Sequence, residues 1–454
     1  MDNKDMGQVF TSEEFTSRRR RLFEKLGGNA SFLVQSAPPV VAFEVFRQSN
    51  EFCYLTGLQT PQSLLLVSEN RSTLFLPPSS AFPRGEEAPL CLEDAQTVMR
   101  LTGVDAVFTS QQLSKYLPSS GALYTPHSPA EGRLACQDTL KFAAKQIALD
   151  YWEAVETREQ RLVGKVRSLK PVLEIRDLSP LIDELRMIKS PAEVAVMRQT
   201  GKLSALAVAE AIRSTRPGVY EYQLAAIADY VYRVNGASGE GYRPIVAGGT
   251  NIWHSHYYQN NCRLDYGDLV IMDYAPDLNN YTSDIGRMWP VNGKYTETQR
   301  ELLGFVLDYH KQLISRIRPG ILPEQVHQET ADVMRDVIKW TSFSKPAYKD
   351  AAVAMISFNG HLSHPVGMAV HDVGTYFGRP LEPGMVFSVD PQLWVKDEQV
   401  YIRVEDTVAV TNTGVEVLTG DVPIDLDDIE VLMTEPGILQ QYPPVMEVKD
   451  VIAR

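Results

Sequence analysis

Cysteine is scarce in this sequence, with 4 residues among 454. Their spacing fits neither a disulfide framework nor a thiolate metal site, which predicts reduced thiols. The four are Cys53, Cys91, Cys136 and Cys262. Long apolar runs are also missing, because no segment approaches the roughly twenty residues that cross a bilayer, and no hydrophobic signal region follows the start. These absences predict a cytoplasmic protein with no membrane partner.

Positive charge is also in short supply. The chain has 44 Lys and Arg residues against 57 Asp and Glu residues, for a net charge of −13. A nucleic-acid partner would require clustered basic residues, so the composition argues against one. The single basic run, Arg18–Arg21, lies in a helical stretch that Thr11 and Glu14 open as a capping box. We expect this run to be a solvated helix face.

A chain of this length, with a hydrophobic content of 44%, can bury more than one core. We expect an amino-terminal α/β domain over residues 1–180 and a catalytic domain over 181–454. Short strands are predicted in the first domain at Phe32–Val34, Leu64–Val67, Thr73–Leu76, Ala106–Phe108 and Ala122–Tyr124. One helix over 139–169, ended by Pro171, is expected to close this domain.

The second domain begins with a strong helix start. Ser190 is a cap, Pro191 takes the first helical position and Glu193 completes a capping box. A further helix is predicted from Thr296 to the stop at Arg318–Gly320. Helices followed by antiparallel hairpins indicate an α+β domain.

Two acidic residues in this domain are predicted to meet on a hairpin. Leu269–Asp273 reads as a buried strand, residues 281–288 as a second strand, and Pro276–Asn280 as the turn between them. Folding about that turn would place Asp273 roughly opposite Asp284, with Cβ atoms about 5 Å apart. Two carboxylates this close repel each other unless a cation lies between them.

A second acidic hairpin is predicted further along the chain. Gly384–Asp390 repeats the spacing and apolar filling of Gly267–Asp273, and a polar turn at Lys396–Gln399 returns the chain to Glu405. Asp390 and Glu405 would therefore face each other. One such hairpin is weak evidence, because acidic residues at strand ends are usually solvated, but two of them flanking a histidine cluster favour a functional site.

Three of the eight histidines, His361, His364 and His371, fall within residues 360–374, and His254 and His256 precede the first hairpin. An oxygen-rich site with one imidazole suits Mn²⁺, Zn²⁺, Co²⁺ or Fe²⁺ rather than a structural zinc, which prefers thiolates. The alternative, that some of these histidines are satisfied core or surface groups, is favoured for His254 and His361.

Over nearly its whole length the sequence resembles aminopeptidase P, the Xaa-Pro aminopeptidase of metallopeptidase group M24, which also includes prolidase, creatinase and methionine aminopeptidase. The segments that carry the resemblance are Phe46–Gly57, Asp183–Pro191, Tyr266–Asp273, Ser283–Gly293, His361–His364, Val370–Gly374, Leu381–Val386 and Ile402–Asp406. The resemblance implies a pita-bread catalytic domain after a smaller creatinase-type domain, two divalent metal ions with Mn²⁺ first, a proline-containing peptide substrate, and a homodimer or homotetramer.

The resemblance also implies a set of metal ligands. Asp273 would bind one ion, Asp284 and Glu405 would bridge both, and His364 would bind the second. The fifth position falls on Asp390, where the family pattern is Glu followed by Pro-Gly and this chain has Asp390–Gln392. The shorter side chain withdraws the carboxylate by roughly 1.5 Å, against a tolerance of about 0.2 Å for metal–ligand distances. A working but altered site is expected.

Further roles follow from the same resemblance. His256 would stabilise the oxyanion, and His371 would contact the substrate near the scissile carbonyl. Arg403 is expected to orient Glu405, the alternative being a surface ion pair of small value. The candidate walls for the proline ring are Tyr242, His256, Trp394 and Tyr401, although core packing explains each equally well. Two milder departures from the family are Gly286, where Thr is common, and Trp394, where Tyr is common.

The function predicted from these features is metal-dependent removal of the amino-terminal residue from peptides with proline in second position. Three alternatives remain open: a prolidase acting on Xaa-Pro dipeptides, a weakly active or non-catalytic pita-bread binding protein, in which Asp390 accompanies lost activity, and a metal-free creatinase-like hydrolase. The last is disfavoured because such relatives lack the five-ligand set.

Overall fold

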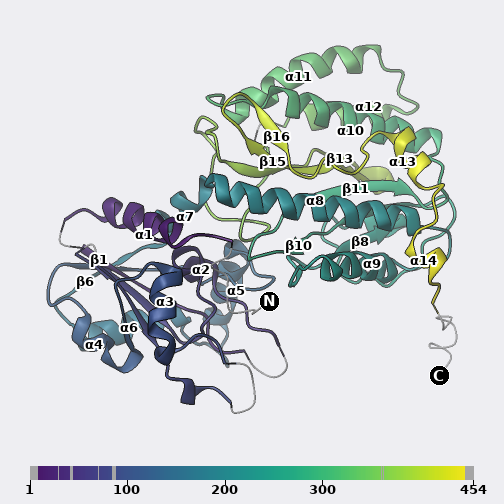
Figure 1. Cartoon of the computed structure of the whole chain (residues 1–454). Coiled ribbons are helices and arrows are strands. Elements are labelled where there is room, and N and C mark those ends of the chain that lie inside the picture. The colour runs from purple at the N-terminus through teal and green to yellow at the C-terminus, as the bar shows by residue number, and fades with distance from the viewer. Residues whose placement is uncertain are drawn as a thin grey trace. The chain divides into compact units, whose positions relative to one another are not determined.

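The structure is a computed structural model that describes residues 9–28, 30–40, 44–69, 71–83, 88–358, 360 and 362–444. The chain forms two compact units (Figure 1), of which the first comprises residues 1–187 with 371–374, and the second 188–370 with 375–454. We retain a domain boundary near residue 180 as a proposal. Within the described ranges, no helix combines the length and apolar composition needed to cross a bilayer.

The first unit is built on a mixed six-stranded sheet in the order β4-β3-β2-β1-β5-β6. Its strands are β1 (Ala30–Gln35), β2 (Leu64–Ser68), β3 (Arg71–Leu76), β4 (Ala106–Thr109), β5 (Ala122–Thr125) and β6 (Glu174–Asp177). The five predicted strands are confirmed as β1 to β5. Leu33, Leu66, Phe75 and Leu123 from four of these strands pack with Val166 in the core.

The helices of this unit are α1 (Ser12–Leu26), α2 (Asn50–Thr56), α3 (Ala95–Thr102), α4 (Leu113–Tyr116), α5 (Gln137–Leu149), α6 (Arg158–Leu169) and α7 (Ser179–Met187). The prediction of one helix over 139–169 is wrong, because α5 and α6 are separate. The Asp150 carboxylate accepts hydrogen bonds from the backbone N–H groups of Trp152 and Glu153, and Thr157 starts α6 with a capping box. Both features end one helix and begin another.

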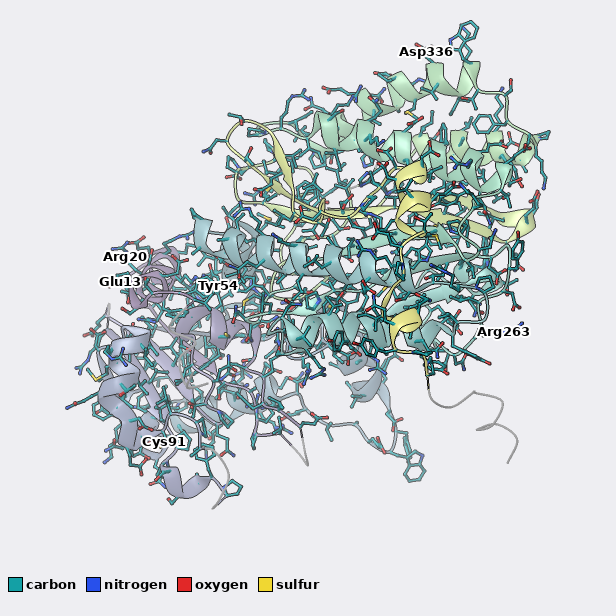
Figure 2. All side chains as sticks on the ribbon, turned by 45° about the vertical axis from the view of Figure 1, so that its right-hand side comes forward. Glu13, Arg20, Tyr54, Cys91, Arg263 and Asp336 are labelled. Carbon is teal, nitrogen blue, oxygen red and sulfur yellow. The ribbon has the colours of Figure 1, made fainter. Side chains whose placement is uncertain are left out.

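The solvated basic face predicted on α1 is only half correct. Arg20 lies on the surface (Figure 2), but Arg18 and Arg19 are buried. Arg18 donates to the Tyr54 carbonyl at 3.0 Å, and Arg19 donates to the Leu55 carbonyl at 2.8 Å. These carbonyls belong to the last turn of α2, where they have no helical partner. The two guanidinium groups therefore fix α1 against the end of α2.

The second unit is organised around an antiparallel sheet in the order β12-β15-β11-β9-β8, with β16 paired to β15. These strands are β8 (Ile245–Gly248), β9 (Leu269–Asp273), β11 (Ile285–Pro290), β12 (Val386–Val389), β15 (Glu405–Val410) and β16 (Val415–Val417). Two smaller ladders join β7 (Gly239–Glu240) to β10 (Pro276–Asp277) and β13 (Gln392–Val395) to β14 (Val400–Arg403).

Helices cover this sheet, with α10, α11 and α12 grouped together and α8 and α9 beside β11 and β8 (Figure 1). Their bounds are α8 (Pro191–Ser214), α9 (Glu221–Val234), α10 (Glu297–Arg316), α11 (Pro323–Trp340), α12 (Pro346–Ile356), α13 (Leu426–Leu432) and α14 (Ile438–Gln441). The capping box predicted at Ser190 is confirmed, and Thr296, the predicted start of a further helix, caps α10 with a capping box of its own. Helices and antiparallel strands thus share one core, as predicted for an α+β domain.

Candidate metal centre

The first acidic hairpin has a different register from the one predicted. Its turn is centred on Asn279 and Asn280, whose positive φ angles of 55° and 64° suit a tight hairpin turn. This turn pairs Asp273 with Gly286 rather than with Asp284. Because side chains alternate along a strand, Asp284 lies two residues away but on the same face as Gly286. The two carboxylates are diagonal neighbours, and the prediction that they lie directly opposite is wrong.

Gly286 has a packing role that the sequence did not show. A Cβ atom at this position would lie 3.0 Å from the Glu405 Cβ and 3.2 Å from its Oε2. These distances are tighter than ordinary contacts, so the absence of a side chain at position 286 leaves room for the Glu405 carboxylate.

The second hairpin has the register that the spacing predicted. Val389 pairs with Asp406 at the end of β12, and Gln392 pairs with Arg403 at the start of β13. The two ladders have the same register, so Asp390, which lies between them in the chain, is opposite Glu405. The hairpin thus carries these two acidic residues toward the same end of the sheet.

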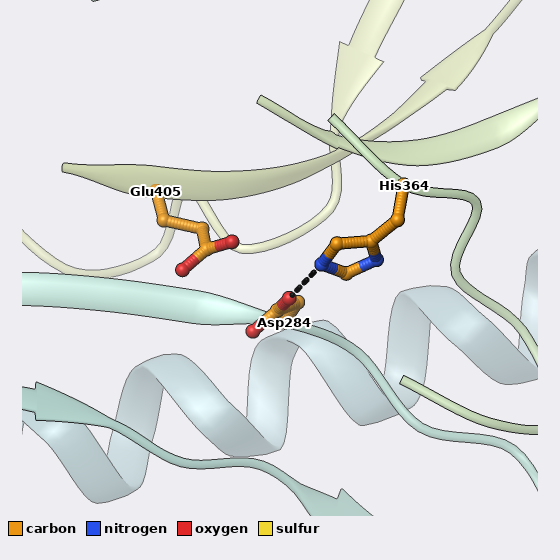
Figure 3. A group of neighbouring side chains, drawn as sticks. All are labelled: Asp284, His364 and Glu405. Atoms are coloured by element: carbon orange, nitrogen blue, oxygen red, sulfur yellow. Dashed lines mark ion pairs between the residues drawn. The ribbon is translucent and has the colours of Figure 1, made fainter. Parts of the chain in front are cut away.

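Three of the five predicted ligands come together. One ligand atom from each of Asp284, His364 and Glu405 lies within 4.8 Å of the others, and Figure 3 shows these side chains pointing toward one another. The His364 Nε2 atom is 3.2 Å from Asp284 Oδ2, and its Nδ1 atom is 3.1 Å from the Pro365 carbonyl. When Nδ1–H donates to that carbonyl, Nε2 presents its lone pair to the carboxylate, and a cation between them relieves the repulsion.

Glu405 is almost completely buried, with 1% of its surface exposed. Its Oε1 accepts a 2.5 Å hydrogen bond from Ser388, while its Oε2 has no hydrogen-bond partner among the described residues. Burial, with the neighbouring charge of Asp284, raises the pKa of Glu405 well above its usual value, and burial with the charge of Asp273 does the same for the pKa of Asp284. Such groups are costly to ionise without a bound cation.

Asp273 lies beside this group but not in it. The Tyr242 hydroxyl is within hydrogen-bond distance of both carboxylates, at 2.6 Å from Asp273 Oδ1 and 2.9 Å from Asp284 Oδ1. The other oxygen of Asp273 accepts a hydrogen bond from Arg403 Nη2. Tyr242 therefore contacts the acidic residues directly, in addition to being a candidate wall for the substrate.

Asp390 is the other predicted ligand that lies outside the group of three. Its Oδ2 accepts a 3.0 Å hydrogen bond from the Gln392 side chain. Gln392 occupies the position that is Gly in the family pattern, so the two departures from that pattern contact each other. The side-chain amide of Gln392 therefore holds the shortened carboxylate of Asp390, two residues before it in the chain.

Arg403 is not a surface residue, and the surface ion-pair alternative is wrong. It is 4% exposed, pairs with Asp273 through Nη2 and lies 3.4 Å from Glu405 Oε2 through Nη1. The closer partner is Asp273 rather than Glu405. Since the guanidinium is shared by two buried carboxylates, it offsets part of their mutual repulsion.

The donor set fits a divalent metal ion. Two buried carboxylates and one imidazole converge, and Glu405 Oε2 accepts no hydrogen bond from the part of the chain that the structure describes. Carboxylate and imidazole ligands are those that Mn²⁺, Zn²⁺, Co²⁺ and Fe²⁺ accept in proteins. Asp284, His364 and Glu405 would hold such an ion, with Asp273 and Asp390 as proposed additional ligands.

The other predicted site residues have varied surroundings. Part of the His256 side chain is exposed, while the groups that cover the rest of it, together with the charge of Arg403, lower its pKa. His371 belongs to the first unit, where its Nδ1 lies 3.2 Å from Asp138 Oδ2. Its contact with substrate stays a prediction. Trp394 and Tyr401 face each other across the β13–β14 ladder. His254 is exposed, and His361 lies outside the described residues.

Two residues that support the site were missed. Ser388 bonds Glu405, and Thr407 accepts a 2.7 Å hydrogen bond from the Asp284 backbone N–H. Each lies two residues from an acidic residue of the second hairpin, Ser388 before Asp390 and Thr407 after Glu405. The alternation of side chains along a strand could have identified both.

Comparisons with known proteins agree with this geometry. Residues 195–412 match the model of metallopeptidase family M24, and residues 15–125 match the aminopeptidase P amino-terminal domain. The Xaa-Pro aminopeptidase of Escherichia coli K12 is 30% identical over 459 residues, which cover 93% of this chain and 97% of that enzyme.

Solved structures show the same two-domain fold. Proline aminopeptidase P II from Yersinia pestis superposes with a TM-score of 0.76 and 31% identity, covering 94% of this chain and 100% of that one. Aminopeptidase P from E. coli with the inhibitor Pro-Leu superposes with a TM-score of 0.75 and 29% identity, covering 94% and 98%. The second unit therefore has the pita-bread fold. The chain belongs to metallopeptidase family M24, on its aminopeptidase P branch, and is a metal-dependent peptidase.

Proposed function

We propose that this enzyme hydrolyses the bond between an amino-terminal residue and a following proline in peptides longer than two residues. The observation that carries the proposal is the convergence of Asp284, His364 and Glu405 in a fold shared with an Xaa-Pro aminopeptidase. An Xaa-Pro bond has no N–H and its proline has a fixed φ, so a site must recognise the ring by shape. Trp394, half-buried near the acidic residues, is the proposed wall.

The proposed site holds two divalent ions, with Mn²⁺ as the first candidate and Zn²⁺, Co²⁺ and Fe²⁺ as alternatives. When bound, such ions supply Lewis-acid chemistry at the scissile carbonyl and make water nucleophilic near neutral pH. Asp273, Asp284, His364, Asp390 and Glu405 are the proposed ligands. We further propose a cytoplasmic homodimer or homotetramer.

The protein's own side chains prepare this reaction. Tyr242 and Arg403 hold the oxygens of Asp273, while Ser388 holds one oxygen of Glu405. Burial and the charge of Arg403 lower the pKa of His256, which favours its neutral form, and the N–H of that imidazole is the proposed donor to the developing oxyanion. His371 is the proposed contact of the substrate near the carbonyl. Asp390 is the proposed acceptor of the proton lost by the attacking water.

Hydrolysis of an Xaa-Pro-Xaa tripeptide and an Xaa-Pro dipeptide in Mn²⁺, together with metal analysis, tests this function. Cleavage of the tripeptide supports it. Cleavage of the dipeptide alone indicates a prolidase, and metal-free protein that cleaves neither indicates a binding protein.

Restoring the family pattern at the shortened ligand should improve metal binding. We expect Asp390→Glu with Gln392→Gly to raise metal affinity by about tenfold, because the longer carboxylate reaches the site and the amide no longer competes for it. Asp390→Glu alone should gain less, since Gln392 still holds the carboxylate. Calorimetric metal titration of the two single variants and the double variant measures this coupling. Equal affinity in all three and in the wild type would show that the short side chain is already well accommodated.

A further inference from the structure

The helix α5 of the first unit lies almost wholly in solvent. Of its 13 residues, all of which the structure describes, Gln137 alone is buried. A helix of a globular domain normally buries an apolar stripe against its neighbours. In α5 the residues Phe142, Lys145 and Leu149 follow one another at intervals of three and four, which places them on one face. All three are exposed, so this face of the helix points into solvent.

The exposed apolar surface continues past the end of α5. Tyr151 and Trp152 follow the helix directly, and each is 88% exposed. Single apolar side chains scattered over a surface need no explanation, but a large group of them marks an interaction site. The group, which we call the α5 patch, consists of six exposed side chains within residues 142–155, namely Phe142, Ile147, Leu149, Tyr151, Trp152 and Val155.

The turn after α5 holds its two aromatic residues in an ordered arrangement. One carboxylate oxygen of Asp150 accepts hydrogen bonds from the backbone N–H groups of Trp152 and Glu153, at 2.7 and 2.8 Å. The rings of Tyr151 and Trp152 pack edge to face, with centroids 5.1 Å apart. Because the turn is ordered before any partner binds, association costs less conformational freedom. Tyr and Trp are also the residue types that contribute most to binding in protein interfaces.

The α5 patch is large enough to form an interface between two copies. Phe142 is 66% exposed, and Tyr151 and Trp152 are more exposed than that. Since an aromatic side chain buries about 150–250 Å² when it is covered, covering these three rings on both copies would bury on the order of 1,000 Å². A specific interface between proteins requires a total area of about 1,000 Å². The other residues of the patch add to this area.

The charges around the patch favour a second copy as its partner. Exposed basic residues lie on the helix and exposed acidic residues follow it, in the order Lys141, Lys145, Asp150, Glu153 and Glu156. Two copies related by a two-fold axis, with their α5 segments antiparallel, bring the basic half of each against the acidic half of the other. An anionic membrane surface would instead repel the acidic half.

We propose that the α5 patch is the surface through which two copies of this protein associate, as a two-fold symmetric dimer with antiparallel α5 segments. Trp152 then packs against Phe142 of the partner subunit, and Lys145 lies near Glu153 of the partner subunit. The inference rests on the homodimer or homotetramer proposed above, for which it names the surface. It does not depend on the peptidase activity.

Trp152→Glu in the full-length protein tests the proposal. We expect the wild type to be a dimer, or a tetramer built from such dimers, and the variant to be half that size, with the dimer dissociation constant raised about a hundredfold. The reason is that a charge enters the centre of an apolar contact. Sedimentation velocity over a concentration series measures both quantities, and the circular dichroism spectrum should be unchanged because the substituted side chain is exposed.

The matched control is Trp340→Glu, which makes the same change at another exposed tryptophan. Trp340 ends α11 in the second unit and is 78% exposed. Its replacement should leave the assembly unchanged.

A charge exchange tests the antiparallel arrangement. Lys145→Glu and Glu153→Lys should each weaken the association, because each places like charges against one another across the two-fold axis. The double variant should restore it. Restoration requires residue 145 of one copy to meet residue 153 of the other, which a partner of different sequence does not provide.

Three results would overturn the inference. A wild type that is monomeric across the series would overturn the proposed homo-oligomer as well, and its binding to vesicles of phosphatidylcholine and phosphatidylserine would assign the patch to a membrane. An assembled wild type matched in size by Trp152→Glu, or an equal loss of assembly in Trp340→Glu, would overturn this inference alone. Assembly is measured without substrate, so these results do not depend on whether the enzyme cleaves Xaa-Pro peptides.

Discussion

Replacing Asp284 by Asn is expected to abolish metal binding and to lower kcat/KM by at least about a thousandfold, equivalent to about 4 kcal/mol of transition-state stabilisation. Asp284 contacts side chains on both sides of the candidate metal centre. One of its oxygens faces His364 at 3.2 Å, and the other lies 2.9 Å from the Tyr242 hydroxyl. A neutral amide of the same size keeps the packing but removes the charge that a divalent ion requires.

The same variant should behave differently in the absence of metal. Burial and the charge of Asp273 raise the pKa of Asp284, which means that its ionised form is unfavourable in the metal-free protein. Asp284→Asn removes that repulsion, so its melting temperature in chelator should equal or exceed that of the wild type. Added metal should stabilise the wild type and leave the variant unchanged.

The control is Asp277→Asn, which makes the same chemical change in the same hairpin. Asp277 is buried, but its carboxylate accepts hydrogen bonds from Ser238 and from the Asn280 backbone, which an amide oxygen can also accept. Metal content and turnover should be retained. Full metal occupancy in Asp284→Asn would contradict the proposed centre.

Replacing Arg403 by Met is expected to destabilise the metal-free protein by about 3 kcal/mol, because it leaves buried carboxylates without their cation. Arg403 pairs with Asp273 and lies 3.4 Å from Glu405. A bound divalent ion would take over part of this neutralisation. The melting temperature should therefore rise more on metal addition in Arg403→Met than in the wild type.

Turnover of Arg403→Met should fall even when metal is saturating, because Asp273 loses the donor that orients it. Arg403→Lys is the matched control, since it keeps the charge but cannot reach both carboxylates with a planar fork. Its stability and turnover should lie between those of the wild type and Arg403→Met. A melting temperature of Arg403→Met equal to that of the wild type in chelator would show that the guanidinium does not neutralise this cluster.

Much of the candidate site follows from local sequence. The strand patterns before Asp273 and Asp390, the polar turns that follow them, and the cluster of histidines between them all depend on residues close in the chain. The register of the second hairpin was correct, because its turn lies at the predicted Lys396–Gln399, enclosed by the pair Val395 and Val400. The register of the first was wrong, because the turn was predicted over Pro276–Asn280, whereas the residues with positive φ, Asn279 and Asn280, centre it later in the chain.

Burial was the harder property to predict. Arg18 and Arg19 have the composition of a solvated face, yet they bind carbonyls at the end of a helix more than thirty residues away in the chain. Arg403 could equally have been a surface residue. In each case the deciding contact is with a segment distant in sequence, which no local pattern specifies.

The sequence by itself determined which chemistry this protein has, because ligand types, their order and their strand context are local properties of the chain. Tertiary structure alone decided how that chemistry is arranged: Asp284, His364 and Glu405 form the group, Tyr242 and Arg403 hold Asp273, and Gln392 holds Asp390. The physical reason is that hydrogen bonding and burial depend on which segments pack together, and packing is settled only when the whole chain has folded.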